Sequence, residues 1–378
     1  MKFSRFDVVI WSILAVLVAG VVMMVLVGQP AEAGLRVVFV MPDENGVNNL
    51  WLIDPQNSDA PEQLTFVTTT IHDYSVSTDG NFIAYAERIA DAPNRNAEIK
   101  LLNMRTRTSQ QLTNCVAEDA DCTTPVFRPD GRMIAYQRTE LNSALGLGVS
   151  PNRVWLLDIN GDTVTNTPLI ADSQVLGYTP KWSADGTKLA FYDTAQSGIY
   201  IYDFAATSAE DSAFALIPTN YGTVGDFSPD GEFMIFPEIQ LGGPLVRATL
   251  QIADLNAGTF TTISESDLDD QEAVWSPDGQ TLAVARRYID DRITRGHQLF
   301  LYNVSDQTFS PLIYDERYLH SYFSWSPDGR YLLMNRFQVL TDDGESNSQG
   351  TLEIWIYDLQ TGDFNQIVTN GYQPRWLP

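Results

Sequence analysis

The sequence predicts an all-β fold: a seven-bladed β-propeller with one blade closed by both termini, preceded by a single N-terminal transmembrane helix. Three observations support this prediction. A turn motif built on Ser-Pro-Asp-Gly recurs at steps of 45 to 55 residues, an apolar strand pattern occurs seven times, and residues 8–27 contain no charged side chain. Such repetition is typical of propellers and solenoids, in which each unit buries its apolar surface against its neighbours.

Composition excludes two classes of protein. The 378 residues include 8 Trp, 16 Tyr and 18 Phe, and 44% are hydrophobic, so the chain can bury enough apolar surface to fold. The 48 Asp and Glu residues against 23 Lys and Arg give a formal net charge of −25. Because a chain of this charge repels phosphate backbones, and no basic patch interrupts the acidic pattern, we expect no nucleic-acid partner.

The first segment predicts a membrane anchor. Lys2 and Arg5 precede the uncharged run at 8–27, and a helix of that length spans about 30 Å, the thickness of a bilayer core. Positive charge before the run favours a cytoplasmic N-terminus. We therefore expect four segments: a cytoplasmic N-terminus at 1–7, a signal anchor at 8–27, a linker at 28–33 and a periplasmic or extracellular propeller at 34–378. Cleavage near Ala33, which would release the protein, is the alternative.

Cys115 and Cys122 are the only two cysteines, and they flank a short polar loop. Export to an oxidising compartment favours a disulfide between them, which in the chain-entropy model contributes about 2–3 kcal/mol. Two free thiols are the alternative. A metal site is not expected, because no histidine or further cysteine lies nearby in the sequence.

The repeated turn is predicted to be a tight hairpin. Proline presets φ near −65°, aspartate suits the next position, and glycine supplies the positive φ that closes the turn. The aromatic residue before the turn belongs to a strand and can wedge against the neighbouring sheet, and a second apolar strand follows. Three complete and three degraded copies are marked by their aspartates: Asp79, Asp130, Asp185, Asp230, Asp278 and Asp328.

A third strand follows each hairpin and ends in Asp or Asn. It occurs seven times, at 50–54, 99–103, 154–158, 199–203, 250–254, 299–303 and 354–358. A fourth strand closes the unit, as at 63–65, 111–113 and 366–369. Because four strands bury little by themselves and an open stack exposes two edges, we expect the units to close radially.

Both chain ends are predicted to share one blade. The last residues, Pro374-Arg375-Trp376-Leu377-Pro378, match a first strand, and Trp376 lies 51 residues after Trp325, in step with the repeat. The segment that starts at Gly34 matches the second strand of a unit. Seven third strands with six complete turns are then explained by one composite blade.

The Ser-Pro-Asp-Gly hairpins, the apolar runs that follow them and the Leu-Thr strand ends resemble the WD40-like (PD40) propeller repeats of TolB-type periplasmic proteins. The resemblance covers nearly all of the chain after residue 34. It implies an extracytoplasmic propeller. The motif is structural and recurs in unrelated binding proteins and enzymes, so it leaves the ligand open.

Strand order assigns the connections to two faces. Turns between first and second strands, and between third and fourth strands, lie on one face, which we name the turn face. Connections between second and third strands, and between blades, lie on the other, the loop face. The long connections are expected on the loop face: 87–97, 140–152, 287–297, 338–350 and the loop with both cysteines. Because the chain enters at the turn face, we expect that face near the membrane and the loop face toward a partner.

Three acidic pairs are expected on the loop face and are candidate binding residues: Asp269 and Asp270, Asp290 and Asp291, Asp342 and Asp343. Paired carboxylates could bind calcium or, at a suitable separation, hydrolyse glycosides, and solvated surface is the alternative. The scattered His72, His297 and His320 are expected to have surface or packing roles, and 146–150 is expected to be a flexible loop.

We therefore predict a membrane-anchored extracytoplasmic propeller that binds an unknown protein or peptide, needs no cofactor and has no catalytic role. The alternative is an extracytoplasmic propeller enzyme or carbohydrate-binding protein that uses the acidic loop residues.

Overall fold

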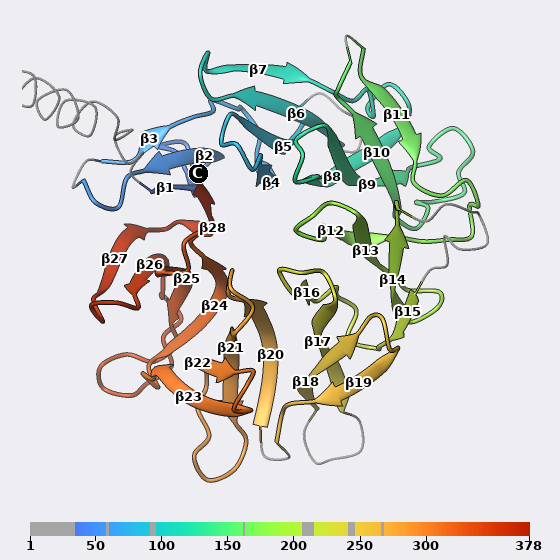
Figure 1. Cartoon of the computed structure of the whole chain (residues 1–378). Coiled ribbons are helices and arrows are strands. Elements are labelled where there is room, and N and C mark those ends of the chain that lie inside the picture. Colours follow the sequence, from blue (N-terminus) through green and yellow to red (C-terminus); the bar gives the residue numbers. More distant parts are fainter. Residues whose placement is uncertain are drawn as a thin grey trace, which may run out of the picture.

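A computed structural model describes residues 35–57, 60–90, 96–161, 163–205, 215–240, 246–265 and 268–378. These residues form seven antiparallel sheets of four strands, arranged in a ring (Figure 1). The predicted all-β, seven-bladed propeller is therefore confirmed. We name the sheets blades A to G, from the blade that contains the first strand.

Each blade runs from an inner strand at the ring axis to an outer strand at the rim. The inner strands are β28 (Tyr372–Leu377), β4 (Ile71–Val76), β8 (Ala120–Phe127), β12 (Tyr178–Trp182), β16 (Asp226–Phe227), β20 (Leu268–Trp275) and β24 (Tyr318–Trp325). The second strands are β1 (Arg36–Pro42), β5 (Phe82–Arg88), β9 (Met133–Glu140), β13 (Lys188–Asp193), β17 (Phe233–Gln240), β21 (Thr281–Tyr288) and β25 (Tyr331–Gln338).

The third and fourth strands complete the blades. The third strands are β2 (Asn48–Ile53), β6 (Ala97–Asn103), β10 (Arg153–Asp158), β14 (Gly198–Asp203), β18 (Arg247–Asp254), β22 (Gln298–Asn303) and β26 (Leu352–Asp358). The outer strands are β3 (Glu62–Gln63), β7 (Thr108–Gln111), β11 (Thr165–Pro168), β15 (Ala215–Pro218), β19 (Thr259–Thr262), β23 (Thr308–Ile313) and β27 (Phe364–Thr369). All seven third strands fall where the sequence predicts them.

Both termini of the propeller meet in blade A, as predicted. β28 pairs with β1 in antiparallel register, with Arg36 opposite Leu377 and Val37 opposite Trp376. The hydroxyl of Tyr74, from blade B, lies 2.8 Å from the carbonyl oxygen of Val38 and 2.6 Å from that of Gln373. The neighbouring blade therefore holds both strands of the closure.

The apolar core lies between blades. One cluster packs Val38 of blade A against Ile71 and Ile83 of blade B, and another packs Leu250 of blade E against Trp275 of blade F. The motif aromatics reach across these seams, as predicted. The indole N–H groups of Trp182, Trp325 and Trp376 donate to the carbonyl oxygens of Val126, Val274 and Ser324, at 3.3, 3.3 and 3.0 Å.

The Ser-Pro-Asp-Gly turn is closed by its own side chains. In blade F the Ser276 hydroxyl donates to Asp278 Oδ1 (2.6 Å), which also accepts the N–H of Gln280 (3.0 Å). Ser276 Oγ accepts the N–H of Thr281 (3.0 Å). Gly279 has a φ of 70°, and all six motif glycines lie between 67° and 72°, so the predicted positive φ is confirmed.

The boundaries predicted for two fourth strands are wrong. β3 ends at Gln63 and β7 at Gln111, before the Leu-Thr pairs that the sequence analysis placed in them. The hydroxyl oxygens of Thr65 and Thr113 instead accept the N–H groups of Leu50 and Ile99, each at 2.9 Å. Because a side-chain oxygen replaces the backbone acceptor, the chain stays beside the third strand without continuing the ladder.

The predicted disulfide between Cys115 and Cys122 is confirmed, with Cα atoms 6.2 Å apart. Both cysteines are fully buried. The buried carboxylate of Glu98 accepts the N–H groups of Cys115 and Val116, each at 2.8 Å. The disulfide attaches the loop before β8 to β8 itself, and Glu98 attaches it to the third strand of blade B.

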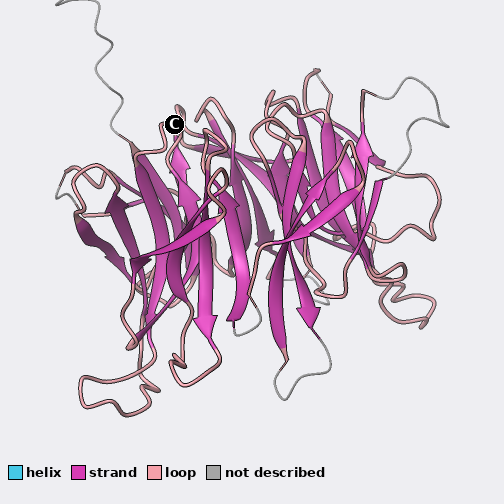
Figure 2. Ribbon diagram, turned by 60° about the horizontal axis from the view of Figure 1, so that its bottom comes forward, coloured by secondary structure: helices cyan, strands magenta, loops and turns pink. Residues whose placement is uncertain are grey.

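The two faces are as the strand order predicts, with one exception. The connections 89–96, 141–152, 289–297 and 339–351 join second to third strands and lie on the loop face. The expectation that every long connection falls there is wrong, because β14 ends at Asp203 and β15 begins only at Ala215, and both of these strand ends lie on the turn face. Figure 2 shows loops extending away from the side on which the chain ends.

The predicted anchor at 8–27 and the flanking segments 1–7 and 28–33 lie outside the described residues. None of the described residues forms a helix that is long and apolar enough to cross a bilayer.

Loss of the disulfide is expected to lower the free energy of unfolding by about 2–3 kcal/mol, because the unfolded chain is no longer closed into a short loop. Denaturant titration of the oxidised protein, the reduced protein and the Cys115→Ala/Cys122→Ala variant measures the difference. The reduced protein is the control, because it keeps both side chains. Equal stability of the oxidised and reduced protein would contradict this expectation.

The Ser–Asp turns are expected to make the propeller sensitive to acid. Serine hydroxyls lower the pKa of Asp79, Asp230 and Asp278 below the ordinary value. Burial alone would raise the pKa of Asp185, but hydrogen bonds from Ser183 and Thr187 lower it to about 2. Carboxylates with a lower pKa in the folded chain stabilise it above the unfolded pKa, and this contribution is lost as the pH falls through the folded value. The midpoint of thermal unfolding should therefore drop between about pH 4 and pH 2.

Ser276→Ala tests the origin of this acid sensitivity. It should cost about 1 kcal/mol at neutral pH and flatten the fall in stability below about pH 4, because Asp278 loses its hydroxyl donor. The turn of blade C is the matched control. Arg128 takes the place of the serine there, so this turn has no serine hydroxyl that a substitution could remove. An unchanged acid profile in Ser276→Ala would mean that other carboxylates determine it.

Candidate functional site

Asp269 and Asp270 lie at the loop-face end of β20, where both carboxylates are buried and paired. Arg286 donates to Asp270 through Nε (2.8 Å) and Nη2 (2.9 Å), and only 3% of the Arg286 side chain is exposed. Arg287 Nη2 lies 2.6 Å from Asp269 Oδ2. Both pairs join β20 to β21, so these aspartates hold the inner edge of blade F in place.

Asp269 also connects blade F to blade E. Its Oδ1 accepts the N–H of Ala248 in β18 (2.8 Å), and His297 Nε2 lies 3.2 Å from its Oδ2. Burial by itself would raise the pKa of Asp269, but the hydrogen bonds from His297 and Ala248 and the charge of Arg287 lower it to about 2. The carboxylate is therefore ionised at neutral pH and acts as a junction between three strands.

The other two acidic pairs lie in loop-face connections. Asp290 pairs with Arg292 (2.5 Å), which lowers the pKa of Asp290, and Asp342 pairs with Arg317 (2.9 Å). Asp291 and Asp343 are exposed. Among the described residues, no three His, Cys, Asp or Glu side chains are grouped so that they could hold a metal ion. A binding role for the three pairs stays a prediction.

The three histidines are not gathered into one site. His72 is exposed, whereas His297 and His320 are buried. Burial, followed by the charge of Arg336, lowers the pKa of His320 to about 4, so this imidazole is neutral at neutral pH.

Exposed apolar side chains are concentrated on the loop face. Seven of the eleven large ones found among the described residues belong to its connections: Phe66, Leu145, Leu147, Val149, Val246, Ile293 and Tyr314. Leu145, Leu147 and Val149 share the connection between β9 and β10 and are 69%, 76% and 65% exposed. Single exposed apolar residues are common on soluble proteins, but a set that gathers on one face is typical of an interaction surface.

A hollow opens on the same face beside blade B. It has a volume of about 530 Å³ and is lined by Thr69, Thr70, His72, Arg88, Ile89 and Ala90. Arg88 pairs with Asp121 of blade C (3.1 Å), so the wall of the hollow is tied to the next blade. The hollow is large enough for one or two side chains of a binding partner.

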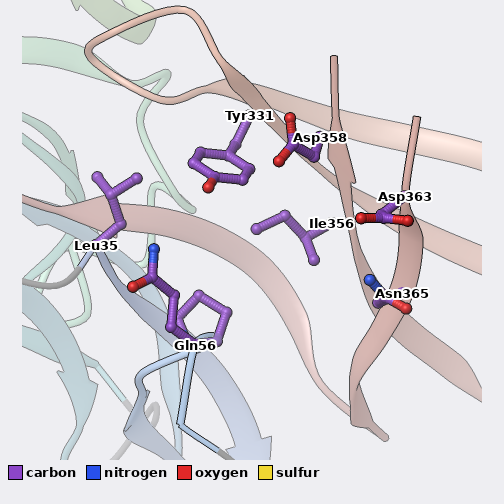
Figure 3. A pocket seen from close by; sticks show the side chains of 8 residues that line it. Leu35, Gln56, Tyr331, Ile356, Asp358, Asp363 and Asn365 are labelled. Atoms are coloured by element: carbon purple, nitrogen blue, oxygen red, sulfur yellow. The ribbon is translucent and has the colours of Figure 1, made fainter. Parts of the chain in front are cut away.

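The turn face carries a smaller hollow at the seam between blades A and G (Figure 3). Leu35 and Gln56 lie on one side of it, and Tyr331, Ile356 and Asp363 on the other. Its volume is about 120 Å³, below the range of ordinary small-molecule sites. Arg330 lowers the pKa of the lining Asp358 to about 2 through a 2.6 Å ion pair.

Sequence reasoning singled out acidic residues and missed the apolar ones. Leu145, Leu147 and Val149 stand in a connection that contains no strand pattern, which leaves them without a sheet to pack on. Apolar residues between two predicted strands are the signal that could have identified this part of the loop face.

The family model for the TolB beta propeller domain, PD40, matches residues 149–378. This is more than half of the chain, and the chain therefore belongs to this family. The resemblance inferred from the turn and strand motifs is thus confirmed.

Two curated relatives match short stretches. The "Primary septum glucan endo-1,3-beta-D-glucosidase" of Schizosaccharomyces pombe is 27% identical over 160 residues, which are 38% of this chain and 16% of that protein. The "Uncharacterized protein YidR" of Escherichia coli is 32% identical over 106 residues, 27% of this chain and 23% of that protein. The chain thus spans less than a quarter of the length of either relative.

Solved structures share the fold at low sequence identity. TolB from Acinetobacter baumannii has a TM-score of 0.51 at 14% identity, over 96% of this chain and 71% of that one. A puromycin-hydrolyzing peptidase of Mycobacterium tuberculosis reaches 0.63 at 13%, over 90% and 54%. The periplasmic gluconolactonase PpgL of Pseudomonas aeruginosa reaches 0.57 at 16%, over 90% and 98%. Since both enzymes and TolB have this fold, it does not by itself decide between catalysis and binding.

Asp270→Asn is expected to lower the free energy of unfolding by about 3–5 kcal/mol, because Arg286 would be left buried without a counter-charge. Denaturant titration measures the loss. Asp343→Asn, in an exposed loop position, is the matched control and should change stability little. Equal stabilities of the two variants would show that Asp270 has no structural role.

Proposed function

We propose that the protein is a non-catalytic scaffold that binds a protein or peptide through its loop face while its N-terminal segment anchors it to a membrane. The observation that carries the proposal is the gathering of seven exposed apolar side chains in the connections of that face. A peptide that covers them would bury apolar area without a change in the rigid blades beneath.

The positions of these side chains favour an extended contact. Phe66 follows blade A, Leu145, Leu147 and Val149 belong to blade C, and Ile293 belongs to blade F. The hollow beside blade B lies between the first two of these blades. Apolar contacts on several blades with a hollow between them suit a partner that crosses the face and inserts a side chain.

The charge of the chain supports a partner that is not itself strongly acidic. A net charge of −25 slows encounter with acidic molecules and speeds encounter with basic ones. The same charge repels anionic lipid headgroups, which favours a partner over the membrane as the ligand of the loop face.

The proposed orientation follows from the position of β1. Arg36 pairs with Leu377 at the turn-face end of blade A, so the described chain begins on that face. An anchor at 8–27 with a linker at 28–33 would reach only about 20 Å beyond the helix. The turn face would then lie over the membrane, and the loop face would point away from it.

Site-specific photo-crosslinking of the full chain, in the cells that make it, tests this function. A photoreactive residue at Leu147 or Ile293 should give a discrete covalent adduct with one or few proteins. The matched controls are Val164 and Phe260, which are also exposed but lie outside the loop face, and they should give none. Leu145→Ser/Val149→Ser should weaken the adduct at Leu147, and adducts that form equally at all four positions would refute the proposed face.

A further inference from the structure

Blade E departs from the repeat at its inner edge. Its inner strand, β16, contains only Asp226 and Phe227, whereas β20 and β24 in the next two blades run over eight residues each (Figure 1). A cavity of about 400 Å³ lies where the strand is missing. The inner strands of four successive blades line this cavity. Each contributes a polar side chain: Lys181, Asp226, Glu272 and Tyr322.

Pro237 explains why the inner strand stops. The N–H of Ser228 donates to the carbonyl oxygen of Phe233 (2.9 Å), so Phe233 directs its polar backbone groups toward β16. Alternate residues of a strand face the same neighbour, which places Pro237 on that side as well. Proline has no N–H to donate, and its carbonyl oxygen is taken by the Thr219 hydroxyl (3.1 Å). The ladder between β16 and β17 cannot continue past this point.

Partly exposed apolar side chains line the cavity. They are Val224, which precedes β16, and Ala273 and Val274 of β20. Ile235 and Leu250 also border the cavity but are buried, with 1% and 0% exposed. The partly exposed side chains provide a wall on which a short hydrocarbon chain can lie.

The polar side of the cavity carries an excess negative charge. Lys181 Nζ lies 2.5 Å from Asp226 Oδ1, so these two charges balance. Glu272 Oε2 and Oε1 accept the N–H groups of Tyr322 (3.0 Å) and Phe323 (3.1 Å). Within the described part of the chain, no cationic side chain lies within ion-pair distance of Glu272, so its carboxylate has hydrogen bonds and no contacting counter-charge.

Burial raises the pKa of Glu272 above the ordinary glutamate value in spite of both N–H donors and the more distant charges of Lys181 and His297. A cation at the carboxylate would offset this cost.

Tyr322 offers a second contact for a positive charge. Its side chain lines the cavity and is 52% exposed. The face of an aromatic ring attracts ammonium and guanidinium groups. The N–H of Tyr322 is held by Glu272, so the ring and the carboxylate stay next to each other.

We propose that this cavity binds a small organic cation, an ammonium or guanidinium group on a short apolar chain. The charged group contacts the Glu272 carboxylate and the Tyr322 ring, and the chain lies on Val224, Ala273 and Val274. The volume of about 400 Å³ is within the range of small-molecule sites. The site is separate from the apolar side chains of the loop face.

The proposal is tested by measuring how hexylammonium and hexan-1-ol bind to the complete protein. Ligand-observed NMR measures the binding of each probe. The two probes share a hydrocarbon chain and differ in charge. The amine should bind, and the alcohol should bind at least about tenfold more weakly. Glu272→Gln should weaken amine binding about tenfold, and Tyr322→Leu about threefold to tenfold.

Glu316→Gln is the matched control, because Glu316 is exposed in the connection between β23 and β24. It should bind the amine as the unmodified protein does. Circular dichroism checks that each variant folds, and Ala273→Phe, which adds bulk to the cavity lining and leaves its charges in place, provides a second route to loss of binding. Equal affinity for both probes, unchanged binding by Glu272→Gln or Ala273→Phe, or no amine binding at millimolar concentration would overturn the proposal.

Discussion

The pairing of β28 with β1 is the constraint on which the rest of the structure depends. The two strands are separated by almost the whole chain, yet they complete one sheet, with Val37 opposite Trp376. Without this pairing, blades A and G would each present an open edge, and the apolar clusters between blades would be exposed at both ends of the row. Closing the ring therefore allows each of the seven sheets to bury apolar side chains against its neighbours.

The two faces of the closed ring differ in their connections and in the side chains that they expose. The Ser-Pro-Asp-Gly turns on one face are short, and their backbone groups are hydrogen-bonded by their own side chains, as Ser276 and Asp278 show. Connections on the other face are longer and carry Leu147 and Ile293 in solvent. Because the blades hold the strand ends, the loop face can vary in sequence without loss of the fold, and binding residues can accumulate there.

The blade that departs from the repeat marks the place where a cavity forms. Five of the motif serines, Ser228 of blade E among them, close their turns in the same way. Blade E keeps this turn but departs from the repeat in its strands, with Pro237 in its second strand and only two residues in β16. The cavity beside this short strand is lined by Glu272 and Tyr322, which belong to the inner strands of blades F and G.

The sequence alone determined the number of blades, the closure by both termini, the Ser-Pro-Asp-Gly turns and the disulfide, because each depends on local chemistry or on a repeat that can be read along the chain. It missed the ends of β3 and β7, where the hydroxyls of Thr65 and Thr113 replace backbone acceptors. Only the tertiary structure decided that Asp269 and Asp270 are buried beside arginines and that Lys181, Asp226 and Glu272 meet at one cavity. The two arginine pairs join neighbouring strands of blade F, whereas Lys181, Asp226 and Glu272 come from successive blades about one repeat apart in the chain. Both depend on how the strands pair and the sheets pack and not on any local pattern.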